Sequence, residues 1–235
     1  LKQKNVDTGM GLERTLAVTN GFSDNYKTEL WLPIIEEIEK LSEKKYDDFK
    51  KEMRIIADHI KASVMILGDQ KGIVPSNTGQ GYVLRRLIRR AVRYAKIIGM
   101  NENFTSKLSD PVIKIYKDIY PEIEKNKNFI KSELKAEENK FSKTLEQGEK
   151  ILSKMSESKN ISGKDVFLLS STYGYPYELT QEYAIENKIR INKSEFDEEM
   201  KKHQDLSRTS SVGMFKGGLA DASEETKKLH TTAHL

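Results

Sequence analysis

The chain contains 235 residues, with 40 Lys and Arg against 36 Asp and Glu, and it has no Cys. A chain of this length suits one or two domains with a real hydrophobic core. The absence of Cys excludes a disulfide scaffold, a thiolate metal site and a Cys nucleophile within these residues, and no apolar run approaches the roughly 20 residues that a membrane-spanning helix needs.

Both ends of the sequence look cut. It begins at Leu1 without a Met, and residues 229–235 stop inside a stretch with helical apolar spacing. No charged and then apolar leader follows the first residue. We therefore expect a middle piece of a longer polypeptide with no membrane partner, and the lack of Cys fits a cytoplasmic location.

The first third of the chain is predicted to form a short strand, a tight turn and three helices. Gly9 and Gly11 lie two residues apart before a helix-forming stretch, which indicates a strand, a turn and a first helix. Apolar residues recur at helical spacing over 28–45 and again over 47–67. Gly and Pro then crowd residues 68–81, which predicts a loop.

The helix after this loop carries most of the arginine in the chain. Five of the nine Arg residues fall within nine consecutive positions, and no acidic residue occurs between Gly79 and Met100. These five are Arg85, Arg86, Arg89, Arg90 and Arg93. Apolar residues from Leu84 to Ile98 form one stripe, so we expect the helix to bury that stripe while the arginines fill its other faces.

The remainder of the chain is predicted to be helical and highly charged. The ranges expected to form helices are 110–120, 122–157, 163–170 and 178–187, the last two flanking a turn at 173–177. Ser194 is a good N-cap for a final polar helix that ends near Leu206. Residues 207–218 are rich in Ser and Gly and are predicted to be a linker. The fold class is therefore mainly α.

The segment from Asp7 to Arg14 has two interpretations. Gly9 and Gly11 permit close backbone approach at a helix N-terminus, where Arg14 would reach a polyphosphate and Asp7 an ammonium group. The alternative is a plain strand-to-helix turn with an exposed ion pair. Spacing alone favours the plain turn, since short Gly motifs are common.

The arginine-rich helix also has two interpretations. A run of charges is usually a solvated face. Phosphate binding is favoured by the choice of Arg in a chain that otherwise prefers Lys, because a guanidinium can bind phosphate with two donors. The loop before the helix supplies Asn77, whose amide both donates and accepts and can therefore read a base edge.

Two histidines near the end of the sequence have the spacing of metal ligands. His230 and His234 lie four residues apart on a predicted helix, so both imidazoles could bind one Zn²⁺. Such a pair is more often coincidence. Two His side chains cannot complete a tetrahedral site, so we expect no tightly held zinc from this pair alone.

The order of motifs along the chain resembles one enzyme family. Residues 5–14, with the sequence NVDTGMGLER, resemble the third class-defining motif of class II aminoacyl-tRNA synthetases in its alanyl form. Further segments similar to the alanyl-tRNA synthetase family are 55–62, 74–77, 81–91, 137–148, 172–180, 215–221 and 229–235. The resemblance thus covers essentially the whole chain.

The resemblance implies roles for the N-terminal motif. Arg14 would bind a phosphate of ATP, which acts with Mg²⁺, and Asp7 would bind the ammonium group of alanine. Gly9 and Gly11 would line the small alanine pocket. The first two class-defining motifs would lie upstream, so we expect this piece alone not to form an adenylate.

The resemblance also implies a tRNA partner. Asn77 would help to recognise the G·U pair in the acceptor stem of tRNA-Ala, next to the five arginines of the basic helix. The family usually carries Asp where this chain has Ser171, and a hydroxyl is a weaker acceptor than a carboxylate. The contact with the G·U pair would therefore be rearranged, or Glu178 or another residue would compensate.

The implied domain organisation has three parts. Residues 1–21 would be the end of a class II α+β catalytic domain, residues 22–206 a helical tRNA-recognition domain, and residues 207–235 a linker and the start of an editing domain. His230 and His234 would be half of a Zn²⁺ site in that editing domain. The alternatives are a non-catalytic basic helical RNA-binding module without G·U specificity, and a purely structural scaffold.

Overall fold

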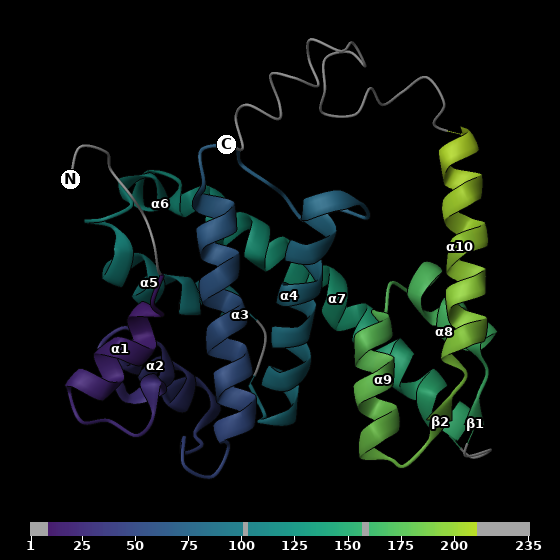
Figure 1. Cartoon of the computed structure of the whole chain (residues 1–235), viewed down its shortest axis with the longest axis horizontal. Helices are drawn as coiled ribbons and strands as arrows, with labels where there is room; N and C mark the ends of the chain where they lie inside the picture. The colour runs from purple at the N-terminus through teal and green to yellow at the C-terminus, as the bar shows by residue number, and fades with distance from the viewer. Residues whose placement is uncertain (1–8, 101–102, 157–159, 211–235) are drawn as a thin grey trace. The chain divides into compact units, whose positions relative to one another are not determined.

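The computed structural model describes residues 9–100, 103–156 and 160–210. Over these ranges the chain is mainly α, as predicted, with one small parallel sheet (Figure 1). None of the described helices is both long and apolar enough to cross a membrane. The chain divides into two compact units between Ile151 and Leu152. This division falls inside the predicted domain 22–206, whose functional boundaries stay predictions.

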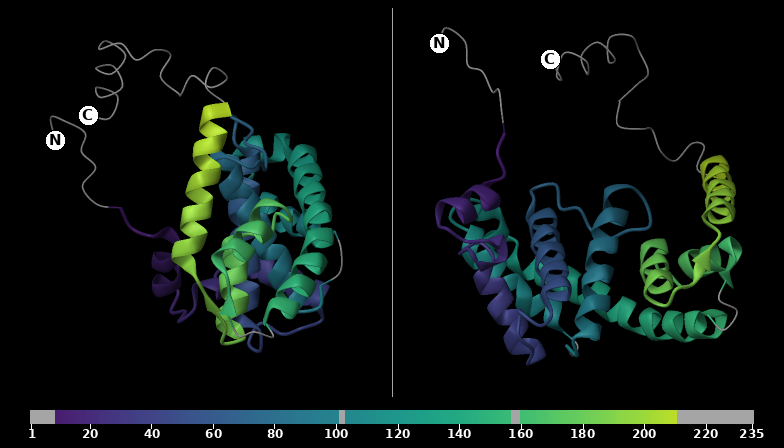
Figure 2. Two further views of the ribbon diagram at one scale, coloured as in Figure 1. Left: turned by 90° about the vertical axis from the view of Figure 1, so that its right-hand side faces the viewer. Right: turned by 60° about the horizontal axis from the view of Figure 1, so that its bottom comes forward.

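The part of the first unit that the structure describes forms seven α-helices, one of which continues into the second unit, and one short 3-10 helix. They are α1 (Leu12–Thr19), η1 (Asn25–Lys27), α2 (Leu32–Ser42), α3 (Lys50–Gly68), α4 (Gly79–Ile97), α5 (Phe104–Tyr116), α6 (Pro121–Lys125) and α7 (Lys127–Ser156). Helices α3 and α4 share the most extensive contact and lie side by side (Figures 1 and 2). The loop between them carries Asn77.

The core of the first unit is the contact between α3 and α4. Ile56, Ile60 and Val64 of α3 are fully buried. The predicted apolar stripe of α4 is buried as well, at Leu84, Ile88, Ala91, Ala95 and Ile98, and only Leu87 of that stripe is partly exposed. Each large aliphatic side chain buried in this way contributes about 1.5–3 kcal/mol.

The second helix begins later than the apolar spacing predicted. Helix α2 starts at Leu32, not at 28, and Pro33 occupies its first turn, where a missing N–H costs nothing and the fixed φ favours a helix start. Before it, Asp24 caps the 3-10 helix η1 by accepting the N–H of Tyr26 at 3.0 Å. The third helix, α3, lies within three residues of its predicted bounds of 47–67.

Two predicted helix boundaries were wrong in the middle of the chain. Helix α5 begins at Phe104 instead of 110 and contains Pro111 in its interior. The buried carboxylate of Glu138 accepts the N–H groups of Phe104 and Thr105 at 3.3 and 3.0 Å, so α7 caps α5 from outside. The predicted helix 122–157 is interrupted at Asn126, which separates α6 from α7.

Within its described residues, 152–156 and 160–210, the second unit contains the end of α7 and five further elements. They are β1 (Asn160–Ile161), α8 (Gly163–Ser171), α9 (Tyr177–Glu186), β2 (Arg190–Ile191) and α10 (Lys193–Ser210). The two strands pair in parallel, with Asn160 opposite Arg190. No strand was predicted here, because two residues are too short to show a period. Helix α8 packs on α10.

Glycine allows the close contact between α8 and α10. A Cβ at Gly163 would lie 2.2 Å from the backbone nitrogen of Phe196. The cap of α10 was predicted at Ser194, but the side chain of Asn192 accepts the N–H of Glu195 at 3.2 Å. Helix α10 also continues to Ser210, past the predicted end near Leu206.

The turn at 173–177 is confirmed as a turn that packs in the core. Gly174 has a φ of 65°, a left-handed conformation that glycine adopts without steric cost. Tyr175 is fully buried, and the ring of Tyr177 stacks on Phe196 with 4.4 Å between centroids. The aromatic residues of this turn therefore stabilise the second unit.

Candidate nucleic-acid interface

Asn77 is exposed in the loop between α3 and α4. The N–H of Ser76 donates to the carbonyl of Gly81 at 3.0 Å, and its hydroxyl donates to the carbonyl of Thr78 at 2.8 Å. These bonds fold the loop back onto the first turn of α4. A Cβ at Gly81 would lie 2.3 Å from the carbonyl oxygen of Val74, so this approach requires glycine.

A hydrogen bond connects Asn77 to the arginine-rich helix. The guanidinium of Arg85 donates through Nη1 to Oδ1 of Asn77. The same guanidinium lies 5.4 Å from the ring centroid of Tyr82, within the range of a cation–π contact. Burial lowers the pKa of Arg85 from its usual value, although an arginine remains charged at any physiological pH.

Arg90 is held by a chain of two further side chains. Its Nη1 lies 2.9 Å from Nε2 of His59, and Nδ1 of His59 lies 3.0 Å from Oδ2 of Asp58. Because a guanidinium only donates, Nε2 must accept and the proton of a neutral His59 belongs on Nδ1. The hydrogen bond from His59 lowers the pKa of Asp58.

Two of the five arginines do not lie on the surface. Arg89 and Arg93 are 7% and 4% exposed, so the expectation that all five fill outer faces was wrong for this pair. Nε of Arg89 donates to Oε1 of Glu137 on α7 at 2.6 Å. The sequence between Gly79 and Met100 has no acid, and the neutralising carboxylate comes from a helix much further along the chain.

Three arginines remain accessible to a ligand. Arg85, Arg86 and Arg90 are partly exposed, and they lie on α4, which follows the Asn77 loop. Side chains that are already held in place lose less conformational entropy when they bind an anion. The described surface around Asn77 therefore combines an exposed amide with pre-positioned guanidinium groups.

The N-terminal motif is described from Gly9 onward, and Asp7 lies outside the described residues. Gly11 is the N-cap residue of α1, and no side chain caps this helix. Arg14 is exposed, and its Nε would lie 3.2 Å from a Cβ placed on Gly11. An uncapped helix N-terminus beside an exposed guanidinium fits a phosphate group. Gly9 has open space around it.

Helix α1 is attached to the rest of the unit by an ion pair. Nζ of Lys61 on α3 donates to Oε1 of Glu13 and lies 4.0 Å from the ring centroid of Trp31. Burial alone would lower the pKa of Lys61, but the hydrogen bond to Glu13 contributes to a net increase. The helix that carries Arg14 therefore has a fixed position on α3.

The remaining predicted site residues are in the second part of the chain. Ser171 is the last residue of α8 and is exposed. His230 and His234 lie outside the described residues. Among the residues that the structure does describe, no group of three or more His, Asp or Glu side chains could hold a metal ion.

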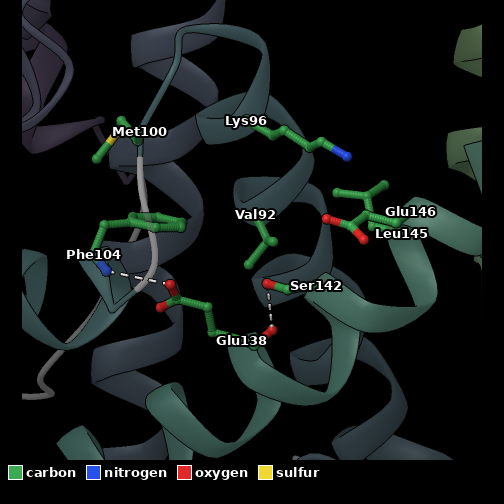
Figure 3. A pocket seen from close by; sticks show the side chains of 8 residues that line it. All are labelled: Val92, Lys96, Met100, Phe104, Glu138, Ser142, Leu145 and Glu146. Carbon is green, nitrogen blue, oxygen red and sulfur yellow. Dashed lines mark hydrogen bonds between the residues drawn. The ribbon is translucent and has the colours of Figure 1, made fainter.

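A pocket lies between α4, α5 and α7 (Figure 3). Its lining residues are Val92, Lys96, Met100, Phe104, Glu138, Ser142, Leu145 and Glu146. Glu138 caps α5, and the hydroxyl of Ser142 donates to the carbonyl of Glu138 at 2.9 Å. Lys96 pairs with Glu149 at 3.0 Å. Glu138 and Lys96 thus form contacts that stabilise the fold.

The sequence of α7 contains a signal for the acidic residues that support α4 and α5, although apolar spacing alone did not predict them. Helix α7 buries Ile130, Leu134, Phe141 and Leu145 at helical spacing. Glu137 and Glu138 fall on the same stripe, at positions that this period reserves for the core. Acidic residues on an apolar stripe indicate buried, paired carboxylates.

Comparison with known proteins gives the family of this chain. Residues 1–234 match the profile of a family described as tRNA synthetases class II (A), and the chain belongs to this family. It is 52% identical over 244 residues to an alanine–tRNA ligase from Borrelia hermsii, and 50% identical over 244 residues to that of Treponema denticola. It is 42% identical over 241 residues to the alanine–tRNA ligase of Pediococcus pentosaceus.

The chain is shorter than these relatives. The first two alignments cover 100% of this chain and 41% of the relative, and the third covers 97% and 27%. The chain therefore spans about two fifths of the length of the Borrelia hermsii and Treponema denticola proteins that it matches.

Proposed function

We propose that this chain is the part of an alanine–tRNA ligase that binds the acceptor stem of tRNA-Ala. Asn77 reads a G·U pair in that stem, and Arg86 and Arg90 contact phosphates beside it. The observation that carries the proposal is the exposed amide of Asn77 next to partly exposed arginines on α4. Ser171 is proposed to face the same base pair from α8.

The surface has the chemistry that an RNA duplex requires. A-form RNA displays base edges and 2′-hydroxyls in a wide, shallow minor groove, which a short side chain on a loop can reach. Phosphate contacts supply affinity, whereas contacts with base edges supply specificity. Because Arg89 and Arg93 are buried, they are not among the proposed phosphate contacts. Both side chains instead pack in the interior of the first unit.

The N-terminal motif would serve the activation of alanine. Arg14 would bind a phosphate of ATP, which acts with Mg²⁺, while Asp7 binds the amino group of alanine and Gly9 and Gly11 line its pocket. The exposed guanidinium of Arg14 beside the uncapped start of α1 supports the first role. The enzyme would then transfer alanine to the terminal ribose of tRNA-Ala, in the cytoplasm.

The editing role would belong to the last residues. His230 and His234 would provide two ligands for Zn²⁺ at a site that removes wrongly attached amino acids. A tetrahedral Zn²⁺ site needs further ligands, and these would have to come from residues outside this chain.

Binding to two RNA hairpins tests the proposal. Both reproduce the acceptor stem of tRNA-Ala, and they differ only in a G·U or a G·C pair at the recognised position. We expect the G·C hairpin to bind more weakly by about 5- to 100-fold at matched salt, as for loss of one base-edge contact. Equal affinities would instead support a basic RNA-binding module without G·U specificity.

Charge reversal tests the phosphate surface separately. Arg86→Glu combined with Arg90→Glu should abolish most binding of either hairpin and flatten its dependence on salt. The matched control is Lys107→Glu with Lys117→Glu, two exposed cations in the same unit on or just after α5. A result in which both double variants weaken binding equally would indicate only non-specific attraction to the net positive charge.

A further inference from the structure

We propose that Arg85 is a positioning residue that orients the amide of Asn77, and that it is not itself a phosphate contact. This inference rests on the proposed function and assigns a separate role to one of the arginines of α4. Its basis is the hydrogen bond from the Arg85 guanidinium to Oδ1 of Asn77.

The bond determines which end of the amide faces outward. Every polar atom of a guanidinium is a donor, so only the carbonyl oxygen of Asn77 can accept from Arg85. The NH₂ group of Asn77 therefore points away from Arg85, with two donors available to a ligand. An Asn77 that is held in this way reads acceptor atoms on the RNA, such as a base carbonyl, a ring nitrogen or a 2′-hydroxyl oxygen.

Arg85 is itself restrained, which makes it suitable for this role. It is half-buried, and its guanidinium lies over the ring of Tyr82. The planar guanidinium presents its donors in fixed directions, so its orientation is transmitted to the acceptor that it binds.

The backbone of the loop completes the arrangement. Ser76, directly before Asn77, forms hydrogen bonds with Thr78 and Gly81, which follow Asn77 in the chain. The loop therefore fixes where Asn77 lies, and Arg85 fixes how its amide is turned. An amide that rotates freely presents its carbonyl as often as its NH₂ group, so it discriminates poorly between donors and acceptors.

Four variants test the role of Arg85 with the two hairpins described above. We expect Arg85→Ala to lower the preference for G·U as much as Asn77→Ala does. In the double variant Arg85→Ala with Asn77→Ala, the preference for G·U should fall no further, because the two changes remove the same interaction. The slope of log affinity against log salt should stay at its original value. Arg85→Lys, which keeps a donor at a similar reach, should restore part of the preference.

The matched contrast is Arg86→Ala, on the next residue of the same helix. Because Arg86 is proposed to contact a phosphate, Arg86→Ala should lower the affinity for both hairpins equally. It should also reduce the slope of log affinity against log salt by about 0.7–0.9. If Arg85→Ala behaves like Arg86→Ala, and its effect adds to that of Asn77→Ala, Arg85 is a phosphate contact and the proposal is overturned.

A measurement on the free protein separates this inference from the proposed function. In a ¹H–¹⁵N spectrum the two side-chain amide protons of Asn77 should shift in the Arg85→Ala variant, while its melting temperature stays unchanged. Unchanged amide signals would overturn the positioning role. If the wild-type chain showed no G·U preference while the signals shifted, the positioning contact would stand and the recognition of G·U would fail.

Discussion

Nε of Arg89 lies 2.6 Å from Oε1 of Glu137, and the two side chains are only 8% and 5% exposed. The pair joins α4 to α7 across 48 residues of sequence. A buried charge is costly without its partner, because the energy of removing it from water is no longer offset by attraction. The carboxylate of Glu137 therefore offsets the cost of burying the Arg89 guanidinium of the arginine-rich helix.

We expect Glu137→Gln to destabilise the first unit strongly. It leaves the buried Arg89 without this carboxylate, and removal of one partner of a buried pair costs about 3–5 kcal/mol. Urea unfolding measures the loss in free energy of unfolding. Glu146→Gln, on an exposed position of the same helix, is the control.

The double variant Arg89→Met with Glu137→Leu makes the test sharper. Replacement of both charges by apolar side chains should lower the free energy of unfolding less than Glu137→Gln alone, because no unpaired charge then remains buried. A double variant that is less stable than the single one would contradict this account of the pair.

Asp24 forms a second cluster, which ties the start of the first unit to α3. Its Oδ2 accepts from the Tyr46 hydroxyl at 2.8 Å and from Nη2 of Arg54 at 2.7 Å. Burial alone would raise the pKa of Asp24, but the hydrogen bonds from Tyr46 and Arg54 outweigh it and lower that pKa. Burial is also the main cause that raises the pKa of Tyr46, to about 12.

The direction of the Asp24 shift predicts a dependence on pH. A carboxyl group with a lowered pKa in the folded state stabilises the protein above its unfolded pKa of about 3.9, and this contribution disappears as the pH falls through the folded value. Asp24→Asn should therefore cost about 2 kcal/mol near pH 6, as for hydrogen bonds to a charged group. The difference from wild type should shrink between pH 4 and pH 2.

Urea unfolding at a series of pH values measures this difference. Asp48→Asn, at an exposed position close to Tyr46, should cost little at any pH. A cost of Asp24→Asn that stays the same down to pH 2 would show that Asp24 contributes through packing and not through its charge.

The sequence predicted those features of α4 that depend on neighbours in the chain. The buried stripe from Leu84 to Ile98 follows from helical spacing alone, and the loop before it follows from its Gly and Pro content. The burial of Arg89 did not follow, because its partner Glu137 is on another helix. The local sequence contains no acidic residue that could neutralise the arginines of α4, whereas the fold places Glu137 of α7 against Arg89.

The same reason explains the missed start of α5. Pro is favoured in the first turn of a helix, and a start at 110 would have placed Pro111 there. The structure starts the helix at Phe104, because Glu138 of α7 accepts the first N–H groups. The adjacent residues Glu137 and Glu138 thus each supply a partner that is distant in sequence. The proposed roles of Asp7 and Arg14, in contrast, rest mainly on the resemblance, since spacing alone favours a plain turn.

Removal of the ion pair between α1 and α3 should loosen α1 locally. Glu13→Gln takes away the carboxylate that Lys61 binds, and a partly exposed pair of this kind contributes about 1 kcal/mol or less. We expect faster hydrogen exchange at residues 12–19 with little change in global stability. Glu29→Gln, on an exposed residue of the same unit, should leave this exchange unchanged, and protection of α1 that survives Glu13→Gln would rule out the ion pair as its anchor.

Gly81→Ala should lower the preference for a G·U over a G·C hairpin although Asn77 itself is unchanged. The new Cβ would lie 2.3 Å from the carbonyl oxygen of Val74 and 2.4 Å from Oγ of Ser76, so the loop must move away from α4. Such overpacking costs about 1–3 kcal/mol and shifts Asn77 relative to Arg85. Because base reading depends on that position, we expect the preference for a G·U over a G·C hairpin to fall, while Gln80→Ala, on the exposed neighbouring residue, should retain it. A Gly81→Ala protein that is less stable but fully discriminating would show that the loop can move without displacing the contact of Asn77 with RNA.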